Sequence, residues 1–249
     1  MTVDSSPTLD VSEYYSSDEV VAEYSSAAEN GLSDIERTVI DTYFTDEDAT
    51  VLDLGCGAGR TTTVLSQRGF DVIGLDLVRS LVDRAKTTSS GIEFVTGNAC
   101  SLPFESESFE YVLFSWNGID HINPEELRYW ALQEVHRVLK PDGVFAFSTH
   151  NFWSAFVIRS FDVKGVQRFV EFWVQNLRRG QIISKYKISN NFSIDSVKIY
   201  YIRPRAQKQQ LRNCGFDPLR IVRPGGPLQR WFDHPYYVAR KIDRCDIGA

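Results

Sequence analysis

The amino-acid sequence predicts an α/β protein with a doubly wound, mostly parallel sheet and helices on both faces. Between residues 45 and 150, short apolar segments alternate with amphipathic ones, as expected for βαβ units whose strands are covered on both faces. The first apolar segment runs directly into Gly55–Gly59, a loop with glycine at every second position. Ligands of such sheets lie beyond the carboxyl ends of the strands, so we expect a ligand at this loop.

Strands are expected where short apolar runs lie between polar or glycine-containing segments. They are predicted at Thr50–Leu54, Asp71–Leu75, Ile92–Thr96, Tyr111–Trp116, Val144–Phe147, Ser193–Arg203, Leu219–Val222 and Tyr236–Lys241. Helices are expected where apolar residues recur at helical spacing. They are predicted as two helices within 19–44, the second capped by Ser33 and Asp34, and at Arg60–Arg68, Ser80–Lys86, Asn123–Lys140 and Arg205–Cys214.

The helix that begins near Asn123 carries several start signals. Asn123 is a favourable N-cap, Pro124 suits the first helical position, and Glu126 can close a capping box. Pro141-Asp142-Gly143 is expected to end this helix ahead of the strand at Val144.

The chain of 249 residues is expected to form a single domain with four parts. Residues 1–44 are predicted to form a helical lid segment, 45–150 the ligand-binding core, 152–182 an inserted helical cap, and 185–249 strands that complete the sheet. For 152–182, a helix packed on the sheet and a basic amphipathic helix that touches a membrane are the alternatives.

Composition and cysteine spacing argue against several classes of protein. The chain is 43% hydrophobic and 24% charged, as in ordinary globular domains, and has no run of about 18 apolar residues that would span a membrane. We expect no signal peptide, because the first residues lack its basic and apolar regions. Cys56, Cys100, Cys214 and Cys245 are too far apart for a zinc ribbon. We therefore expect no metal site and a reducing, cytoplasmic location.

Charge is divided unevenly along the chain. Residues 1–150 hold 9 basic and 26 acidic side chains, whereas residues 151–249 hold 18 basic and 7 acidic ones. The two halves can attract each other within one fold or between subunits. Alternatively, the basic half receives an anionic partner such as an acidic small molecule, RNA or a membrane surface.

Asp53 and Asp76 distinguish the expected ligand site from a dinucleotide site. The dinucleotide fingerprint G-x-G-x-x-G would need a third glycine where Arg60 stands. Asp53 places a carboxylate where a pyrophosphate would need amide donors. Asp76 follows Gly55 by 21 residues, at the end of the second strand, and can accept both hydroxyls of a ribose. These features indicate an adenosine ligand without a pyrophosphate.

The ordered motifs resemble those of the class I S-adenosylmethionine-dependent methyltransferases, and more narrowly the small-molecule group called methyltransferase domain 11. The resemblance covers about residues 45–150 and is carried by Val51–Arg60, Val72–Asp76, Thr96–Phe104, Phe109–Val112 and Val135–Gly143. It implies a Rossmann-like, seven-stranded sheet. It also implies S-adenosylmethionine as cofactor and S-adenosylhomocysteine as product.

The same resemblance assigns cofactor contacts to positions of this sequence. It places the loop glycines beneath the methionine portion, Asp76 at the ribose, and Asn98 and Ala99 at the adenine, although the family more often has Asp at the position of Asn98. Tyr14, Tyr15 and Tyr24 stand where relatives often carry a lid. The expected cofactor-binding residues are Asp53, Gly55, Cys56, Gly57, Gly59, Arg60, Asp76, Leu77, Asn98, Ala99, Ser115, Tyr14 and Tyr24.

Two histidines are candidates for a general base. His121 follows the fourth strand on the ligand side of the sheet, and Asp120 is placed to orient its ring, as in an acid–histidine pair that relatives often carry. His150 follows the fifth strand at the same edge. A base is needed only when the methyl acceptor is protonated, and both histidines can instead have packing roles.

These features favour methyl transfer to a small molecule, most readily to oxygen or nitrogen. Methylation of RNA or protein through the basic C-terminal half is the first alternative. A non-catalytic S-adenosylmethionine-binding subunit and a NAD-linked oxidoreductase are further alternatives. The fourth strand is not followed by an Asn-Pro-Pro-Tyr motif, which argues against methylation of nucleic-acid bases. The expected partner is a small-molecule substrate, and the expected assembly is a monomer or homodimer.

Overall fold

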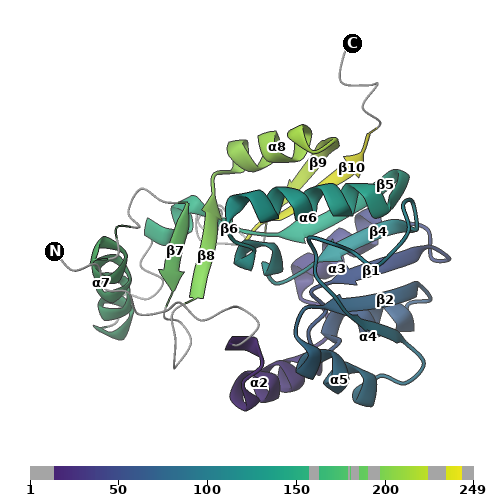
Figure 1. Cartoon of the computed structure of the whole chain (residues 1–249), viewed down its shortest axis with the longest axis horizontal. Coiled ribbons are helices and arrows are strands. Elements are labelled where there is room, and N and C mark those ends of the chain that lie inside the picture. The colour runs from purple at the N-terminus through teal and green to yellow at the C-terminus, as the bar shows by residue number, and fades with distance from the viewer. Residues whose placement is uncertain are drawn as a thin grey trace, which may run out of the picture.

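The computed structural model describes residues 14–156, 163–178, 180, 185–189, 197–223 and 234–242. Its centre is a seven-stranded sheet with the order β3-β2-β1-β4-β5-β10-β9, flanked by helices on both faces (Figure 1). All neighbouring pairs are parallel except those that β10 makes with β5 and β9. The strands are β1 Thr50–Leu54, β2 Asp71–Asp76, β3 Glu93–Thr96, β4 Phe109–Phe114, β5 Leu139–Ser148, β9 Phe216–Val222 and β10 Tyr236–Lys241. The predicted fold class is confirmed.

The helices follow the amphipathic segments of the sequence. They are α2 Asp18–Ala28, α3 Asp34–Tyr43, α4 Arg60–Gln67, α5 Arg79–Thr88, α6 Glu125–Val138, α7 Val163–Arg178 and α8 Pro204–Asn213. At the start of α3, Ser33 and Glu36 form a capping box, so the predicted cap at Ser33 is confirmed.

The predicted cap of α6 is wrong. Pro124 is the N-cap and no side chain caps the helix, so neither Asn123 nor Glu126 acts as predicted. The Asn123 amide instead donates to the carbonyl oxygen of His121, at 3.2 Å. Asn123 therefore belongs to the turn that precedes the helix.

Strand alternation sends side chains to two separate cores. Along β5, Phe145 and Phe147 face the core that α6 and α8 cover, and Ala146 faces the core that α3 covers. α6 contributes buried Leu132 and Val135, and α3 contributes Val39 and Ile40. The sheet is thus covered on both faces, as a doubly wound fold requires.

β4 ends earlier than predicted. The strand was expected to reach Trp116, but it stops at Phe114. Trp116 and Asn117 have φ values of 47° and 59°, which a strand cannot continue through. They lead into a short 3₁₀ turn, Gly118–His121, and this turn brings His121 to the carboxyl edge of the sheet.

The C-terminal strands do not all complete the main sheet, which corrects the expectation for 185–249. β8 (Val197–Ile202) lies between β6 (His150–Asn151) and β7 (Tyr186–Ser189) and pairs with both in a separate three-stranded sheet. β9 and β10 alone among the described strands of this region join the main sheet. Figure 1 shows the small sheet between α7 and the main sheet. α7 therefore does not pack on the main sheet.

The predicted cap segment 152–182 contains a 3₁₀ turn, Phe152–Phe156, followed by α7. Residues 157–162, 179 and 181–182 of that segment, and 1–13 of the predicted lid, lie outside the described residues. Among the described residues, no helix is long and apolar enough to cross a membrane.

Candidate functional site

A cavity of about 470 Å³ lies at the carboxyl ends of β1, β2 and β4. It stands where the topology of a doubly wound sheet places a ligand. Most of the sequence-predicted site residues meet here, from elements far apart in the chain. Those that line the cavity are Tyr24, Gly55, Gly57, Asp76, Leu77, Asn98, Ala99, Ser115 and His121.

The glycine loop forms the floor of this cavity. Gly55 and Gly57 have φ values of 68° and 55°, in the left-handed region that favours glycine. A Cβ atom on Gly57 would lie 3.3 Å from the Tyr24 ring, in the space between the loop and the N-terminal helix α2. The missing side chain therefore keeps the backbone open to a ligand.

Asp76 is held at the cavity wall by two backbone amides. Its Oδ2 accepts from the Gly57 amide and its Oδ1 from the Val78 amide, each at 2.8 Å. Each carboxylate oxygen keeps a further lone pair for a ligand hydroxyl. Burial raises the pKa of Asp76, and the two amide bonds oppose that shift.

Asp53 lies behind the loop and does not line the cavity. It is fully buried, and its Oδ2 accepts from the hydroxyls of Thr61 and Thr62, at 2.5 and 2.6 Å. Its Oδ1 has no hydrogen-bond partner within the described ranges. Burial raises the pKa of Asp53 to about 6. The hydrogen bonds from Thr61 and Thr62 hold the first turn of α4 against β1.

Three other predicted cofactor residues also lie outside the cavity wall. Cys56 is buried in a cluster with Phe94 below the loop, and burial raises the pKa of its thiol. Gly59 is the N-cap of α4. Arg60 turns away and forms a buried ion pair with Glu36.

Aromatic side chains form a further wall of the cavity. Tyr15 and Tyr24 come from the N-terminal segment, and Trp116 and His121 follow β4. Their rings meet edge to face, with centroids 5.5 Å apart for Tyr15–Tyr24 and Tyr15–His121, and 5.7 Å apart for Tyr24–Trp116. Tyr14 packs against Tyr15 and does not line the cavity.

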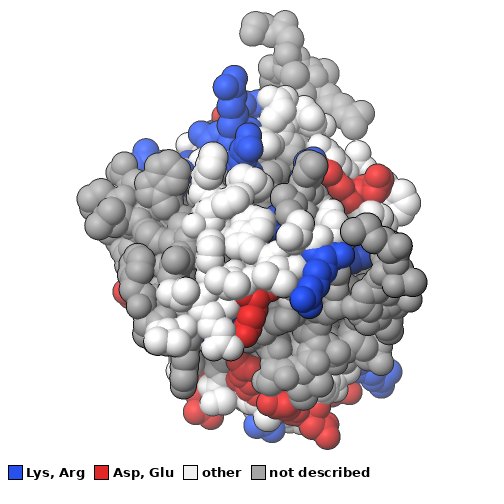
Figure 2. Space-filling view, turned by 90° about the vertical axis from the view of Figure 1, so that its left-hand side faces the viewer, with Lys and Arg blue, Asp and Glu red and all other residues white. Residues whose placement is uncertain are grey.

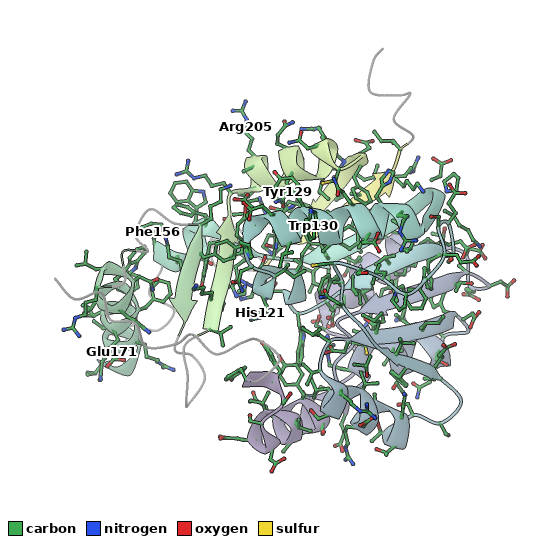
Figure 3. All side chains as sticks on the ribbon, in the orientation of Figure 1. His121, Tyr129, Trp130, Phe156, Glu171 and Arg205 are labelled. Atoms are coloured by element: carbon green, nitrogen blue, oxygen red, sulfur yellow. The ribbon has the colours of Figure 1, made fainter. Side chains whose placement is uncertain are left out.

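His121 has the environment of a neutral imidazole. Figure 3 shows it between the small sheet and α2. Its Nε2 lies 3.2 Å from the Tyr15 hydroxyl, and its buried Nδ1 has no hydrogen-bond partner among the described residues. Burial lowers the pKa of His121 to about 4, and the nearby His150 acts in the same direction.

Asp120 does not orient His121, contrary to expectation. Its carboxylate accepts from Arg128 at 2.9 Å, from the Thr149 hydroxyl at 2.6 Å, and from the backbone amide and Nδ1 of His150 at 2.5 and 2.8 Å. Burial alone would raise the pKa of Asp120, but these partners hold it below its usual value. His150 is therefore fixed in this buried cluster, outside the cavity wall.

Sequence reasoning missed several parts of the site. The block of residues after β4 was expected to supply only Ser115 and His121, yet Trp116, Ile122 and Asn123 also line the cavity. The left-handed turn that carries Trp116 has no sequence signal beyond Asn117-Gly118.

A family model described as "Methyltransferase domain" matches residues 51–143. A solved S-adenosylmethionine-dependent methyltransferase of Methanosarcina mazei is 18% identical, with a TM-score of 0.65 over 85% of this chain and 99% of that one. A Burkholderia thailandensis 1,6-didemethyltoxoflavin N1-methyltransferase, solved with S-adenosylhomocysteine, is also 18% identical. Its TM-score is 0.58 over 98% of this chain and 99% of that one. These likenesses show the fold.

Curated relatives match in part of their length. An uncharacterized protein of Methanocaldococcus jannaschii is 32% identical over 146 residues, which are 58% of this chain and 53% of that protein. The malonyl-[acyl-carrier protein] O-methyltransferase of Salmonella typhimurium is 33% identical over 101 residues, 41% of this chain and 39% of that one. The chain thus spans about half the length, or less, of these relatives.

Fold and site together define an α/β domain with a cavity at a glycine-rich loop, at the carboxyl edge of its sheet. Residues 51–143 match a methyltransferase domain, and the relatives and fold neighbours support S-adenosylmethionine as the cofactor. The predicted family and cofactor are confirmed. Assignment to the methyltransferase domain 11 group stays a prediction.

The residues present fit that cofactor. Asp76 offers lone pairs to the ribose hydroxyls, and the bare backbone at Gly57 leaves room for the methionine portion. Asn98 faces the cavity, and its Oδ1 accepts from the Cys100 amide at 2.9 Å, which fixes the side chain.

Proposed function

We propose that this protein transfers a methyl group from S-adenosylmethionine to an oxygen or nitrogen atom of a small molecule. One observation carries the proposal: one cavity joins the glycine loop and Asp76 to an aromatic wall containing a partly buried histidine whose Nδ1 has no hydrogen-bond partner among the described residues. The first part suits the cofactor, and the second suits an acceptor that must lose a proton.

The chain's main contribution is to hold the reactants in line. When bound, the cofactor supplies an electrophilic methyl group on a sulfonium, whose sulfur ends the reaction as a neutral thioether, so no general acid is required. Asp76, Gly57 and Asn98 are proposed to fix its position. Alignment of this kind can lower a barrier by about 7–11 kcal/mol in favourable cases.

His121 is proposed to take the proton that the acceptor loses. Because its pKa is about 4, the ring is neutral at pH 7 and its nitrogen can accept a hydrogen bond. A base this weak suits an acceptor whose proton becomes acidic only as the new bond to carbon forms. The contact with the Tyr15 hydroxyl holds the ring at Nε2, and the unpartnered Nδ1, which is buried in this structure, is the nitrogen proposed to receive the proton. Base catalysis of this kind contributes about 10²–10⁴-fold.

The small-molecule assignment draws on the relatives. By their names, one relative is an O-methyltransferase of malonyl-[acyl-carrier protein], and one solved neighbour methylates N1 of 1,6-didemethyltoxoflavin. Tyr15, Tyr24 and Trp116 give this chain an aromatic cavity wall of the kind that binds compact apolar or planar ligands. We propose that it works as a monomer or homodimer.

A second candidate is methylation of an anionic macromolecule. Figure 2 shows Lys and Arg gathered at the top of one face, where Figure 1 has α8, and Asp and Glu mostly at the bottom, near α2. Arg203, Arg205 and Arg212 are exposed there. A solved structure from Haloferax volcanii, described as a complex between the methyltransferase activator Trm112 and a "putative methyltransferase", is 17% identical with a TM-score of 0.66 over 94% of this chain and 98% of that one.

Radiolabelled methyl transfer into an extract of the source cells separates the two candidates. The extract is incubated with the protein and methyl-labelled S-adenosylmethionine, then split into small-molecule, protein and nucleic-acid fractions. We expect label in the small-molecule fraction, and none with Gly57→Val as the control. Label in a macromolecular fraction would favour the second candidate, and no label in any fraction would contradict both.

A further inference from the structure

Glu36 on α3 is a fully buried carboxylate with an unusual number of partners. Its Oε2 accepts from the amide and hydroxyl of Ser33 and from Arg60 Nη1, each at 2.8 Å. Its Oε1 accepts from Arg60 Nη2 at 2.5 Å, from the Tyr236 hydroxyl at 2.9 Å, and from the Ser115 hydroxyl. Burial would raise its pKa, but Arg60 lowers it to about 2, so Glu36 is ionised.

Only some of these contacts are needed to neutralise the charges. Arg60 alone satisfies the ion pair, and Ser33 belongs to the cap of α3. The bonds to Ser115 and Tyr236 do something different, because they reach the residue that follows β4 and the first residue of β10. The Ser115 and Tyr236 hydroxyl oxygens also lie 2.5 Å apart, so their two protons are shared among the three contacts that these hydroxyls make with Glu36 and with each other.

The residue after Ser115 is the part of the site that most needs support. Trp116 and Asn117 both have left-handed φ values, which for residues other than glycine persist only when the surroundings enforce them. On the far side of the turn, the Asn117 amide donates to the Ser148 hydroxyl at 2.8 Å. On the near side, the support is Ser115 bonded to Glu36 and Tyr236.

The same network also supports the Trp116 ring. The Arg60 guanidinium, fixed by Glu36, lies over the indole with its central carbon 4.1 Å from the ring centroid. The indole also packs edge to face with the Tyr24 ring in the cavity wall, with centroids 5.7 Å apart. One buried carboxylate thus fixes both the backbone before Trp116 and the cation behind its ring.

We propose that Glu36 and Tyr236 are positioning residues that hold Trp116 in the cavity wall of the methyl-transfer site. The inference rests on the proposed function for its catalytic consequence, but not for the placement of Trp116. Neither residue lines the cavity, and each acts through Ser115 or Arg60.

The test follows Trp116 directly by fluorine NMR. The chain has five tryptophans, so protein labelled with 5-fluorotryptophan gives a small set of resonances, and Trp116→Phe assigns the one in question. We expect Tyr236→Phe, which keeps the ring and removes the bonding hydroxyl, to shift or broaden the Trp116 resonance. Glu36→Gln is expected to do so more strongly.

Tyr237→Phe is the matched control, because Tyr237 is the next residue of β10 and faces the opposite core. Its removal of a buried hydroxyl should leave the Trp116 resonance unchanged. Ser33→Ala is a second control that weakens the cap of α3 and keeps the Ser115 and Tyr236 bonds. A Trp116 resonance that is unchanged in a folded Tyr236→Phe variant, or equally changed in Tyr237→Phe, overturns the proposal.

Kinetics provide the second readout. With methyl transfer established, Tyr236→Phe is expected to lower kcat by about 10–100-fold through misplacement of the cavity wall. The KM for S-adenosylmethionine should stay within about threefold, because Asp76 and the glycine loop are untouched. A normal kcat alongside a shifted Trp116 resonance would overturn the catalytic part alone. If the wild-type protein shows no methyl transfer, the proposed function fails. The fluorine NMR experiment still tests whether Glu36 and Tyr236 position Trp116.

Discussion

At the scale of single residues, the site depends on two buried titratable groups that face one cavity. Asp76 keeps hydrogen-bonding capacity toward the cavity although two amides hold it in place. His121 keeps an unpartnered nitrogen within the described structure and is neutral at pH 7 because burial lowers its pKa to about 4. The proposed chemistry needs both states, and each has a measurable consequence.

Asp76→Ala is expected to weaken S-adenosylhomocysteine binding by about 1–3 kcal/mol, because a charged acceptor for two hydroxyls is lost. Isothermal titration calorimetry measures the change. Asp71→Ala is the matched control, since Asp71 is the exposed first residue of the same strand. Equal affinities for wild type and Asp76→Ala would remove Asp76 from the ribose site.

His121 is expected to make the protein less stable in acid. Its folded pKa of about 4 lies below its ordinary value of 6.5, so between these values the unfolded chain binds a proton that the folded chain does not. The stability associated with the neutral ring is complete above pH 6.5 and is lost as pH falls toward 4, by about 3 kcal/mol in total.

Urea unfolding of wild type and His121→Gln at pH 7 and pH 4 measures this loss. We expect the wild type to lose about 3 kcal/mol more than the variant, in line with the linkage between pKa and stability. If both proteins lose the same free energy of unfolding, the ring is not kept neutral by burial.

At the scale of elements, the glycine loop and the turn after β4 shape the cavity, and both depend on left-handed backbone. Glycine serves this purpose in the loop, where its absence of a side chain also leaves space for a ligand. After β4, Trp116 takes the same backbone region and supplies a ring. The glycine loop can be predicted from the spacing of its glycines. The turn at Trp116 cannot, because it depends on contacts with distant elements.

Gly57→Ala and Gly91→Ala separate backbone strain from loss of space. Both glycines have positive φ, 55° and 86°, so each substitution is expected to destabilise the fold by roughly 1–2 kcal/mol. Only Gly57 lines the cavity, and a Cβ there would also lie 3.3 Å from the Tyr24 ring, whereas nothing lies within 4 Å of one at Gly91. We expect S-adenosylhomocysteine binding to fall in Gly57→Ala alone, measured by calorimetry beside thermal melts. Equal binding by both variants would place the cofactor elsewhere.

At the scale of the whole molecule, some basic side chains of the C-terminal half form ion pairs with acidic side chains of the N-terminal half. Lys185 pairs with Glu125 at 2.6 Å, and Lys241 lies 3.7 Å from Glu107, so two contacts link the basic and acidic halves. Attraction within one fold therefore accounts for part of the pattern. The exposed cations of α8 are not part of these two contacts.

These two contacts are expected to differ in their contribution to stability. The Lys185 side chain is 56% exposed, so Lys185→Gln should change the free energy of unfolding by less than about 1 kcal/mol. The Lys241 side chain is 6% exposed and donates to the Leu139 carbonyl at 2.6 Å. Lys241→Gln should therefore destabilise by about 1–3 kcal/mol in urea unfolding. The reverse order would show that surface charge pairing dominates.

Local sequence patterns predicted most of the main sheet and several residues of the cavity. The features that they did not predict depend on pairing between residues far apart in the chain. β1 and β10 lie where apolar runs predicted them, and Gly57, Asp76 and Asn98 meet at one cavity because parallel strands end at one edge. The partner of β8 and the partner of Asp120 could not be predicted, since hydrophobic periodicity marks a strand without naming its neighbour. Glu36 was likewise hidden, because its partners come from four separate segments of the chain.

A crystal structure of the protein grown with S-adenosylhomocysteine tests the central claim most directly. The account predicts density for the ligand in the cavity beside Gly57, with both ribose hydroxyls on the Asp76 carboxylate and the homocysteine sulfur facing the wall that holds Trp116 and His121. Density for the ligand at another place, or a cavity that stays without it at millimolar concentration, would contradict the account.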